Sequence, residues 1–301
     1  MKMKILIVMP HIFAPKSDSL YSSNNEGKRE AKSKALYRAT IENLNQHNKN
    51  AWIHTPRKKD KKVVTRKITS ENSVDLKIQV YTKRERNLVE NLPKHEKLEI
   101  ILCDNTEDTE IPQYASKSVL EQAEEYDILG YIEDDILIED AEFFDKIRFL
   151  MDILPNNYTV LPHRCEWVDE KGDVILSGDP EGGRNDLFWD TGEKIKFEWG
   201  RVSRTIYRAT NPHSGCFFLS REQAINVRTF WQKRDWNSPF MLSGPLEHAA
   251  SGRLIECLKI MKTVPSDYRF LKVKHCDELW KRHDFDDREE TLQPGRELRE
   301  W

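Results

Sequence analysis

The chain has 301 residues, enough for one large α/β domain or two small ones with a substantial core. Its 48 Lys and Arg residues nearly balance its 51 Asp and Glu residues, and a formal charge of -3 argues against nucleic acid as a partner. Hydrophobic residues at 38% and charged residues at 33% indicate a globular protein rather than a disordered or membrane-embedded one.

The cysteines and the hydropathy pattern indicate the cellular compartment of the protein. The five cysteines are scattered and include no C-x-x-C pair, which favours reduced thiols in a cytosol. No stretch approaches the roughly 20 apolar residues that cross a bilayer, so we expect no transmembrane segment. The sequence therefore predicts a cytoplasmic protein whose membrane contact, if it has any, is peripheral and at the inner face of the membrane.

The first half of the chain predicts short apolar strands of the kind that is buried on both faces of a mainly parallel sheet. These strands cover residues 4–9, 76–81, 98–103 and 126–132. Residues 27–46 lack proline and favour a helix between the first two strands. The basic run 57–67 (RKKDKKVVTRK) is typical of a solvated loop or strand edge, with contact to phosphate or to an anionic membrane surface as the alternative.

The second half alternates helices with short strands. Residues 141–154 have an apolar face at helical spacing, with Asp140 available as N-cap, and residues 158–168 are strand-like. Glycine-rich turns over 169–183 predict a hairpin or a long active-site loop. The remaining predictions are a strand at 216–219, a helix opened by the capping box at 220–223, a helix from 245 to about 261, and an irregular charged tail beyond Pro265.

This alternation predicts an α/β fold in which ligands bind beyond the carboxyl ends of the strands. Glu133, Asp134 and Asp135 lie there, directly after the predicted strand 126–132. Three neighbouring carboxylates repel one another unless a cation is present, and hard oxygen ligands suit Mg²⁺ or Mn²⁺ together with substrate phosphates. The alternative is a charged turn whose acids complement the dipole of the following helix.

Three further sequence motifs follow this triplet along the chain. The string YDILGYIEDDILIEDAEFF resembles the strand, acidic motif and helix of the GT-A class of glycosyltransferases, whose D-x-D or x-D-D motif holds the metal and the donor ribose. Residues 213–221 (HSGCFFLSR) resemble the glycine-bearing strand and basic turn before the acceptor-side helix of these enzymes. Residues 243–247 (SGPLE) look like the place of a catalytic base in inverting members, and 274–277 (KHCD) resembles the late histidine that completes a metal shell.

The resemblance implies a role for each matching residue. Asp135 and His275 would ligate the metal, and Glu133 or Asp134 would contact the ribose or a metal-bound water. Glu247 would act as the general base that takes the proton from an acceptor hydroxyl. For Glu247 and His275 the plain alternatives are a dipole-complementing acid and a hydrogen-bonded surface histidine.

The nucleotide of the donor would lie beyond the first strands. In GT-A enzymes the loop after the first strand commonly holds the base, which here selects Pro10 and His11. The run 98–108 (LEIILCDNTED) looks like the strand and aspartate that bind the base in the family-2-like branch, which selects Asp104.

Together these features predict a GT-A-like, Rossmann-like mixed and mostly parallel sheet flanked by helices. We expect one catalytic domain over 1–301, with a nucleotide-sugar part at about 1–140 and an acceptor part at about 141–301. The implied function is Mn²⁺- or Mg²⁺-dependent transfer of a hexose from a nucleotide-sugar donor to a glycan or glycolipid acceptor, with inversion favoured, in cell-surface polysaccharide synthesis. The alternatives are a sugar-phosphate nucleotidyltransferase and a non-catalytic carbohydrate-binding protein.

Overall fold

A five-stranded sheet forms the centre of the computed structural model, which describes residues 2–13, 26–48, 51–57, 59–68, 73–169, 171–176, 193–208, 213–234 and 244–276. The strand order is β13-β6-β1-β4-β5, in which β13 alone runs antiparallel to its neighbour. The bounds are β1 Met3–Pro10, β4 Val74–Thr82, β5 Leu98–Leu102, β6 Ile128–Ile132 and β13 Cys216–Ser220. This mixed, mostly parallel sheet confirms the predicted α/β class and the predicted strands.

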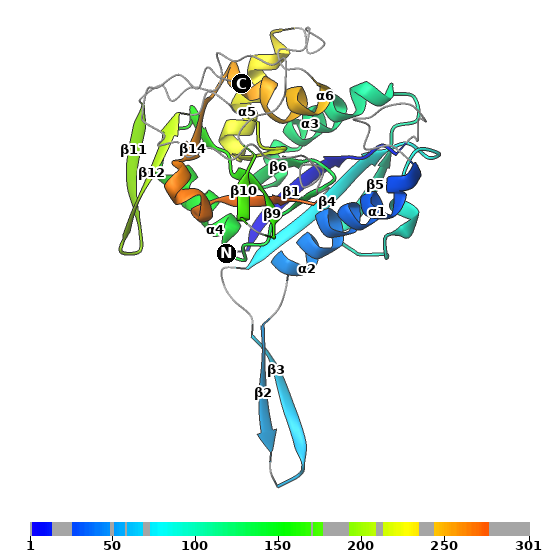
Figure 1. The fold of residues 1–301 in the computed structure, drawn as a ribbon, viewed down its shortest axis with the longest axis vertical. Helices are drawn as coiled ribbons and strands as arrows, with labels where there is room; N and C mark the ends of the chain where they lie inside the picture. Colours follow the sequence, from blue (N-terminus) through cyan, green and yellow to red (C-terminus); the bar gives the residue numbers. More distant parts are fainter. Residues whose placement is uncertain are drawn as a thin grey trace.

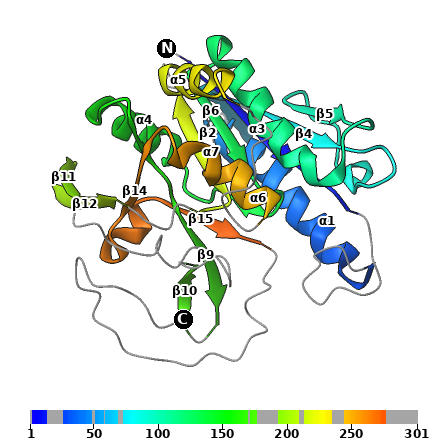
Figure 2. The ribbon, with the colours of Figure 1, turned by 90° about the horizontal axis from the view of Figure 1, so that it is seen from above.

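Helices cover both faces of this sheet (Figure 1). One face packs against α1 (Arg29–Tyr37), the π-helical turn Arg38–Glu42, α2 (Asn43–His47) and α4 (Phe143–Ile153). The other packs against α3 (Ile111–Glu121) and α5 (Arg221–Gln232), which lie over the strands when the molecule is seen from above (Figure 2). Side chains of a buried strand alternate between these two layers, which explains why the predicted strands are continuous apolar runs. Within the described residues, no helix is both long and apolar enough to cross a bilayer.

The predicted helix at 27–46 is confirmed as α1, the π-helical turn and α2 in succession. The predicted capping box of α5 is also present, because Ser220 Oγ accepts from the Gln223 N–H and Gln223 Oε1 accepts from the Ser220 N–H. For α4 the N-cap prediction was wrong. Glu142 occupies the N-cap position, and Asp140 lies two residues before it, where its Oδ1 accepts from the Glu142 N–H at 2.9 Å.

Gly130, in β6, lies opposite Phe218 of β13, and large side chains pack closely around it. A Cβ atom placed on Gly130 would lie 2.8 Å from Phe218 Cδ1 and 3.3 Å from Ile7 Cγ1. Gly130→Ala is therefore expected to lower the free energy of unfolding by about 1–3 kcal/mol, the usual cost of overpacking a core. Urea denaturation measures this change, and an unchanged midpoint would show that Phe218 moves aside without cost.

The prediction of one helix from 245 to about 261 was wrong. The helical part consists of α6 (Pro245–Glu247), the π-helical turn His248–Gly252 and α7 (Arg253–Ile255). Strand β14 (Lys259–Thr263) follows, paired with β12 on one side and β8 on the other. Ile260 and Met261 are buried there. Pairing with strands distant in sequence thus overrides an apolar spacing that also fits a helix.

Two smaller sheets flank the end of the central one. The first has the order β10-β9-β15-β7, and the second has the order β11-β12-β14-β8. Their remaining bounds are β7 Ile136–Leu137, β8 Tyr158–Val160, β9 His163–Val168, β10 Gly172–Ile175, β11 Lys194–Trp199, β12 Val202–Arg208 and β15 Lys272–His275.

These sheets settle several predictions about the second half. The strand-like segment 158–168 divides into β8 and β9, which belong to different sheets. The predicted hairpin after it is confirmed as β9–β10, while 177–183 lie outside the described residues. The expected irregularity beyond Pro265 was wrong for residues 265–276, where a 3-10 helix (Pro265–Phe270) and β15 follow, while 277–301 lie outside the described residues.

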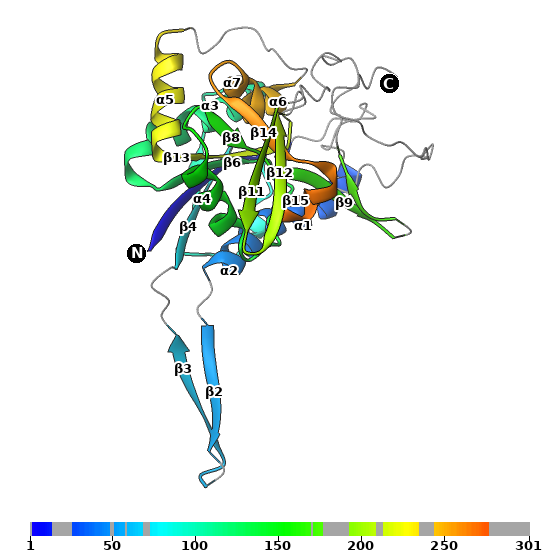
Figure 3. The same ribbon diagram turned by 90° about the vertical axis from the view of Figure 1, so that its left-hand side faces the viewer.

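The basic run 57–67 falls largely in a separate β-hairpin. Strands β2 (Ala51–Arg57) and β3 (Lys62–Ile68) pair antiparallel and form a sheet of their own. This hairpin projects from the body of the molecule in two perpendicular views (Figures 1 and 3). The strand-edge interpretation of the run is therefore confirmed.

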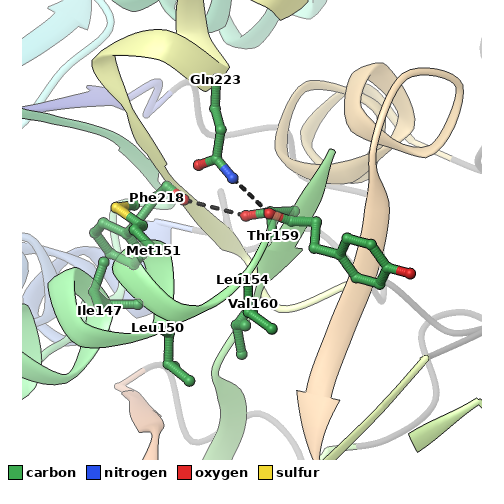
Figure 4. A pocket seen from close by; sticks show the side chains of 9 residues that line it. Ile147, Leu150, Met151, Leu154, Thr159, Val160, Phe218 and Gln223 are labelled. Carbon is green, nitrogen blue, oxygen red and sulfur yellow. Dashed lines mark hydrogen bonds between the residues drawn. The ribbon is translucent and has the colours of Figure 1, made fainter. Parts of the chain in front are cut away.

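A small void lies in the core under α4, between β8 and β13 (Figure 4). Its volume is about 10 Å³, which holds at most one water molecule. Two hydrogen bonds close it, from Gln223 Nε2 to the Tyr158 carbonyl and from Thr159 Oγ1 to the Phe218 carbonyl. We therefore regard it as a packing feature and not as a ligand site.

Candidate active site

The acidic triplet occupies the tight turn between β6 and β7. The Glu133 N–H donates to the Gly215 carbonyl at 2.8 Å, and the Ile136 N–H donates to the Glu133 carbonyl at 3.2 Å. The Cys276 N–H donates to the Asp135 carbonyl at 2.7 Å. Backbone bonds to the segments beside β13 and β15 thus hold the three carboxylates at the carboxyl end of the sheet, as predicted.

Asp134 is held by the histidine that follows β1. His11 Nδ1 lies 2.6 Å from Asp134 Oδ2, and the Leu88 N–H donates to His11 Nε2 at 3.0 Å. Because Nε2 accepts a hydrogen bond, the proton of this neutral ring is on Nδ1 and is donated to Asp134. His11 is buried, whereas the Asp134 side chain is 17% exposed, so the aspartate can reach a ligand at the surface.

Asp135 is buried between two cationic side chains. Its Oδ2 lies 3.3 Å from Lys32 Nζ and 3.4 Å from His275 Nε2. Burial alone would raise the pKa of this carboxyl, but the charges of His275 and Lys32 outweigh burial and hold the pKa far below its ordinary value. Its Oδ1 is buried without a hydrogen-bond partner among the described residues.

A second carboxylate orients His275 from behind. His275 Nδ1 lies 2.6 Å from Oε1 of the buried Glu166. Burial lowers the pKa of His275, yet the charge of Asp135 and hydrogen bonds to both carboxylates raise it to about 9. A carboxylate on the far nitrogen is the arrangement that fixes a metal-binding histidine, because it keeps the proton on Nδ1 and directs Nε2 forward.

Glu133 faces the interior. Its carboxylate lies 3.6 Å from Arg164 Nη1 and 3.9 Å from His213 Nε2. Gly215 has a φ of +64°, and a Cβ there would lie 3.0 Å from Glu133 Oε2. The backbone conformation therefore favours glycine, and the Glu133 carboxylate leaves little room for a side chain at this position. The surroundings of Glu133 suit charge compensation in the core, and the predicted ribose contact falls more naturally to Asp134.

Glu247 lies in the first turn of α6, where its carboxylate folds over Gly244 so closely that a side chain at Gly244 would collide with it. Burial raises the pKa of Tyr131, in β6, well above its ordinary value. The acidic side chains whose charge adds to this shift are Glu133, Glu247, Asp134 and Asp135. One buried phenol therefore lies within electrostatic reach of Glu247 and of the whole triplet.

The other two nucleotide-binding candidates lie differently. Pro10 is the buried last residue of β1, paired in register with Tyr81. Asp104 follows β5, where its Oδ1 accepts from the Arg84 N–H at 2.9 Å. Since β5 is three strands from β6, Asp104 is roughly 14 Å across the sheet from the triplet. The structure does not bring it together with the other candidates.

The described residues contain no group of three or more His, Cys, Asp or Glu side chains placed to hold a metal ion. A pair fits better. Two ligands in adjacent positions, each about 2.1 Å from an octahedral ion, lie roughly 3 Å apart. Asp135 Oδ2 and His275 Nε2 are 3.4 Å apart, and Asp135 Oδ1 is a buried oxygen for which the described residues supply no hydrogen bond. These residues fit Mn²⁺ or Mg²⁺, which fills its other positions with water and phosphate oxygens.

Sequence reasoning missed Lys32, Arg164, Glu166 and Tyr131. A signal for Lys32 was present, because it falls at helical spacing with Ala35, Leu36 and Ala39, all of which are buried. A lysine on the buried face of a helix requires an anionic partner. Arg164 and Glu166 alternate with Cys165 along β9, a pattern that indicates a polar strand face but not its partners.

A cavity of about 420 Å³ lies on the other face of the sheet that carries His275. Cys165, Trp167, Lys272 and Lys274 line it, whereas Arg164, Glu166 and His275, on the same strands, face the acidic triplet. The cavity is therefore separated from the candidate metal ligands by the thickness of a strand layer, and it contributes nothing to their geometry.

No family model and no curated protein matches the chain. One similar solved structure is mannose-1-phosphate geranyltransferase from Thermus thermophilus, with 12% identity, a TM-score of 0.37, and coverage of 86% of this chain and 73% of that one. Another is GalNAc-T7 with UDP, GalNAc and Mn²⁺, with 10% identity, a TM-score of 0.38, and coverage of 91% of this chain and 43% of that one. At these values the similarity assigns no function.

Proposed function

We propose that the chain is a glycosyltransferase that transfers a sugar from a nucleotide-sugar donor to a hydroxyl acceptor and requires Mn²⁺ or Mg²⁺. The observation that carries the proposal is the buried pair of Asp135 and His275, with Glu166 behind the histidine, at the carboxyl end of a mostly parallel sheet. Ligands of such sheets bind at that end. We further propose a glycan or glycolipid acceptor and a role in cell-surface polysaccharide synthesis, which follow from the GT-A resemblance.

In this proposal Asp135 and His275 Nε2 hold the metal, while Glu166 keeps the remaining proton of the histidine on Nδ1. The bound ion would supply Lewis-acid stabilisation of the leaving diphosphate. Lys32 Nζ, which lies near both Asp134 and Asp135, provides a second positive charge on the same side. Asp134, oriented by His11, accepts a hydrogen bond from the donor ribose or from a water.

Glu247 accepts the proton of the acceptor hydroxyl as that oxygen attacks the anomeric carbon. An inverting transfer needs no protein nucleophile, and one carboxylate within hydrogen-bond reach of the hydroxyl suffices. Pro10 and His11 lie at the carboxyl end of β1, where we place the nucleotide base, and Asp104, at the end of β5 two strands away, is left without a role in this proposal. The division into a donor part at about 1–140 and an acceptor part at about 141–301 stays a prediction.

The proposal is tested by thermal shift and product analysis on the full chain. UDP-, GDP-, CMP- and dTDP-sugars are screened with and without Mn²⁺, and the released nucleotide is identified. A donor that stabilises the protein only with Mn²⁺ and yields a nucleoside mono- or diphosphate supports the transferase. Pyrophosphate formed from a nucleoside triphosphate and a sugar phosphate would instead identify a nucleotidyltransferase. Metal-independent binding without turnover would identify a carbohydrate-binding protein.

Glu166→Gln is expected to weaken Mn²⁺ binding by about 10- to 100-fold, the usual effect of losing the carboxylate behind a ligating histidine. The amide still fills the space but no longer favours a proton on His275 Nδ1. Titration of Mn²⁺ followed by electron paramagnetic resonance measures the affinity. Glu139→Gln is the matched control, because Glu139 pairs with Lys274 at 3.2 Å, beside His275 in β15. Equal affinities of the two variants would contradict the assignment.

A further inference from the structure

The β2–β3 hairpin, residues 51–68, is hereafter called the arm. Its two strands pair in a simple register from Ala51 opposite Ile68 to Arg57 opposite Lys62. Figures 1 and 3 show it extending away from the central sheet and the helices. An isolated two-stranded ribbon is marginally stable by itself, so an exposed arm of this kind gains from a surface on which to lie.

The arm concentrates positive charge. Seven Lys or Arg residues and one acid, Asp60, give residues 51–68 a net charge of +6. The whole chain carries -3, so the remaining residues together carry -9. Such a separation of charge directs the arm toward an anionic surface while the rest of the molecule is repelled from it. It also opposes the pairing of two arms from different copies.

The arm also exposes large apolar side chains. The exposed fractions are 54% for Trp52, 50% for Ile53, 61% for Val63 and 42% for Ile68. The register places Trp52 and Val63 on one face, and Ile53 and Ile68 on the other. Lys67 lies opposite Trp52 and Arg66 lies opposite Ile53, so basic and apolar side chains share both faces.

This combination of basic and exposed apolar side chains favours a lipid surface over other polyanionic partners. Phosphate contacts along a nucleic acid use the basic side chains but leave exposed Ile and Val in water. At a bilayer the same lysines meet anionic headgroups, while Trp and aliphatic side chains enter the interfacial region. Pairs such as Trp52 with Lys67 bring both contacts to one place.

We propose that the arm is a peripheral anchor that binds a bilayer containing anionic lipids. Six net positive charges and four exposed apolar side chains supply the two contributions, electrostatic and hydrophobic, that stable peripheral binding requires. The proposal does not depend on the transferase function, and its test requires no substrate.

The test measures sedimentation of the full chain with vesicles of phosphatidylcholine alone or mixed with phosphatidylglycerol. The wild type is expected to bind only the mixed vesicles, more weakly as salt rises. The triple variant Lys59→Gln, Lys61→Gln, Lys62→Gln is expected to bind roughly 100-fold more weakly, and Trp52→Ala combined with Val63→Ala to bind at least about 10-fold more weakly. The control neutralises three exposed lysines elsewhere, Lys94, Lys117 and Lys233, and keeps most of the binding.

Several results would overturn the proposal. They are failure of the wild type to bind mixed vesicles, equal binding to both kinds of vesicle, and equal losses in the arm and control variants. Binding to duplex DNA that exceeds binding to mixed vesicles would also overturn it and would assign the arm to nucleic acid. Because the mutated side chains are exposed, thermal unfolding of each variant should match the wild type, which separates loss of the anchor from loss of the fold.

Discussion

Asp135→Asn is expected to abolish the Mn²⁺-dependent thermal stabilisation by a nucleotide sugar and to lower kcat/KM by about 1,000-fold or more. The amide keeps the size of the side chain but loses the negative charge that lies 3.4 Å from His275 Nε2 and 3.3 Å from Lys32 Nζ. A neutral ligand holds a hard divalent cation far less strongly than a carboxylate. The measurement is a thermal-shift series with and without Mn²⁺, followed by steady-state kinetics.

The structural cost of this variant must be measured separately. Removing the Asp135 charge leaves Lys32 and His275 without their anion, and breaking a buried ion pair costs about 3–5 kcal/mol. Circular dichroism and urea denaturation therefore precede the kinetics. Asp140→Asn is the matched control, because Asp140 lies near the same turn but pairs with Lys146 at 2.6 Å. If folded Asp135→Asn protein keeps its metal-dependent stabilisation, the site is assigned to the wrong residues.

Glu247→Gln is expected to lower kcat by about 100- to 10,000-fold, the range that general-base catalysis contributes. The glutamine fits the same space over Gly244 but cannot accept a proton. Because Glu247 does not ligate the metal in this proposal, donor affinity and the Mn²⁺-dependent thermal shift should remain at wild-type values. Separate measurement of kcat and the donor KM tests both parts of the expectation.

Glu222→Gln distinguishes catalysis from a helix-dipole effect. Glu222 and Glu247 both lie in the first turn of a helix, α5 and α6 respectively, so loss of either charge weakens the same kind of dipole interaction. Catalysis by Glu247 requires that only its variant lose turnover. A similar small effect of both substitutions on kcat would mean that Glu247 is a dipole-complementing acid and that the base lies elsewhere.

Local patterns predicted several parts of this molecule correctly. The runs 4–9 and 126–132 form buried central strands, because a continuous apolar segment of this length can be satisfied only between two covered faces. The capping box at Ser220 fixed the start of α5 because its hydrogen bonds span three residues. The acidic triplet was correctly placed at a strand end because it directly follows the predicted strand 126–132.

Local patterns gave wrong predictions where the same pattern is compatible with both a helix and a strand. Residues 259–263 fit a helical apolar stripe, yet they form β14 because β8 and β12 offer partners on both sides. The β11–β12 hairpin was not predicted, although residues 194–199 (KIKFEW) alternate polar and apolar side chains as a half-buried strand does. For residues 259–263 the deciding information is not carried by the local pattern.

The sequence alone thus determined the α/β class, the core strands and the acidic cluster, because these depend on burial and hydrogen bonding among neighbouring residues. The resemblance to GT-A enzymes implied that His275 lies near Asp135, and only the tertiary structure decided their contact and the place of Glu166 behind the histidine. These contacts arise because β15 pairs with β7 and β9 across separations of more than 100 residues. Such pairing is selected by the packing of the whole chain, since no residue near His275 in the sequence specifies which strand edge it joins.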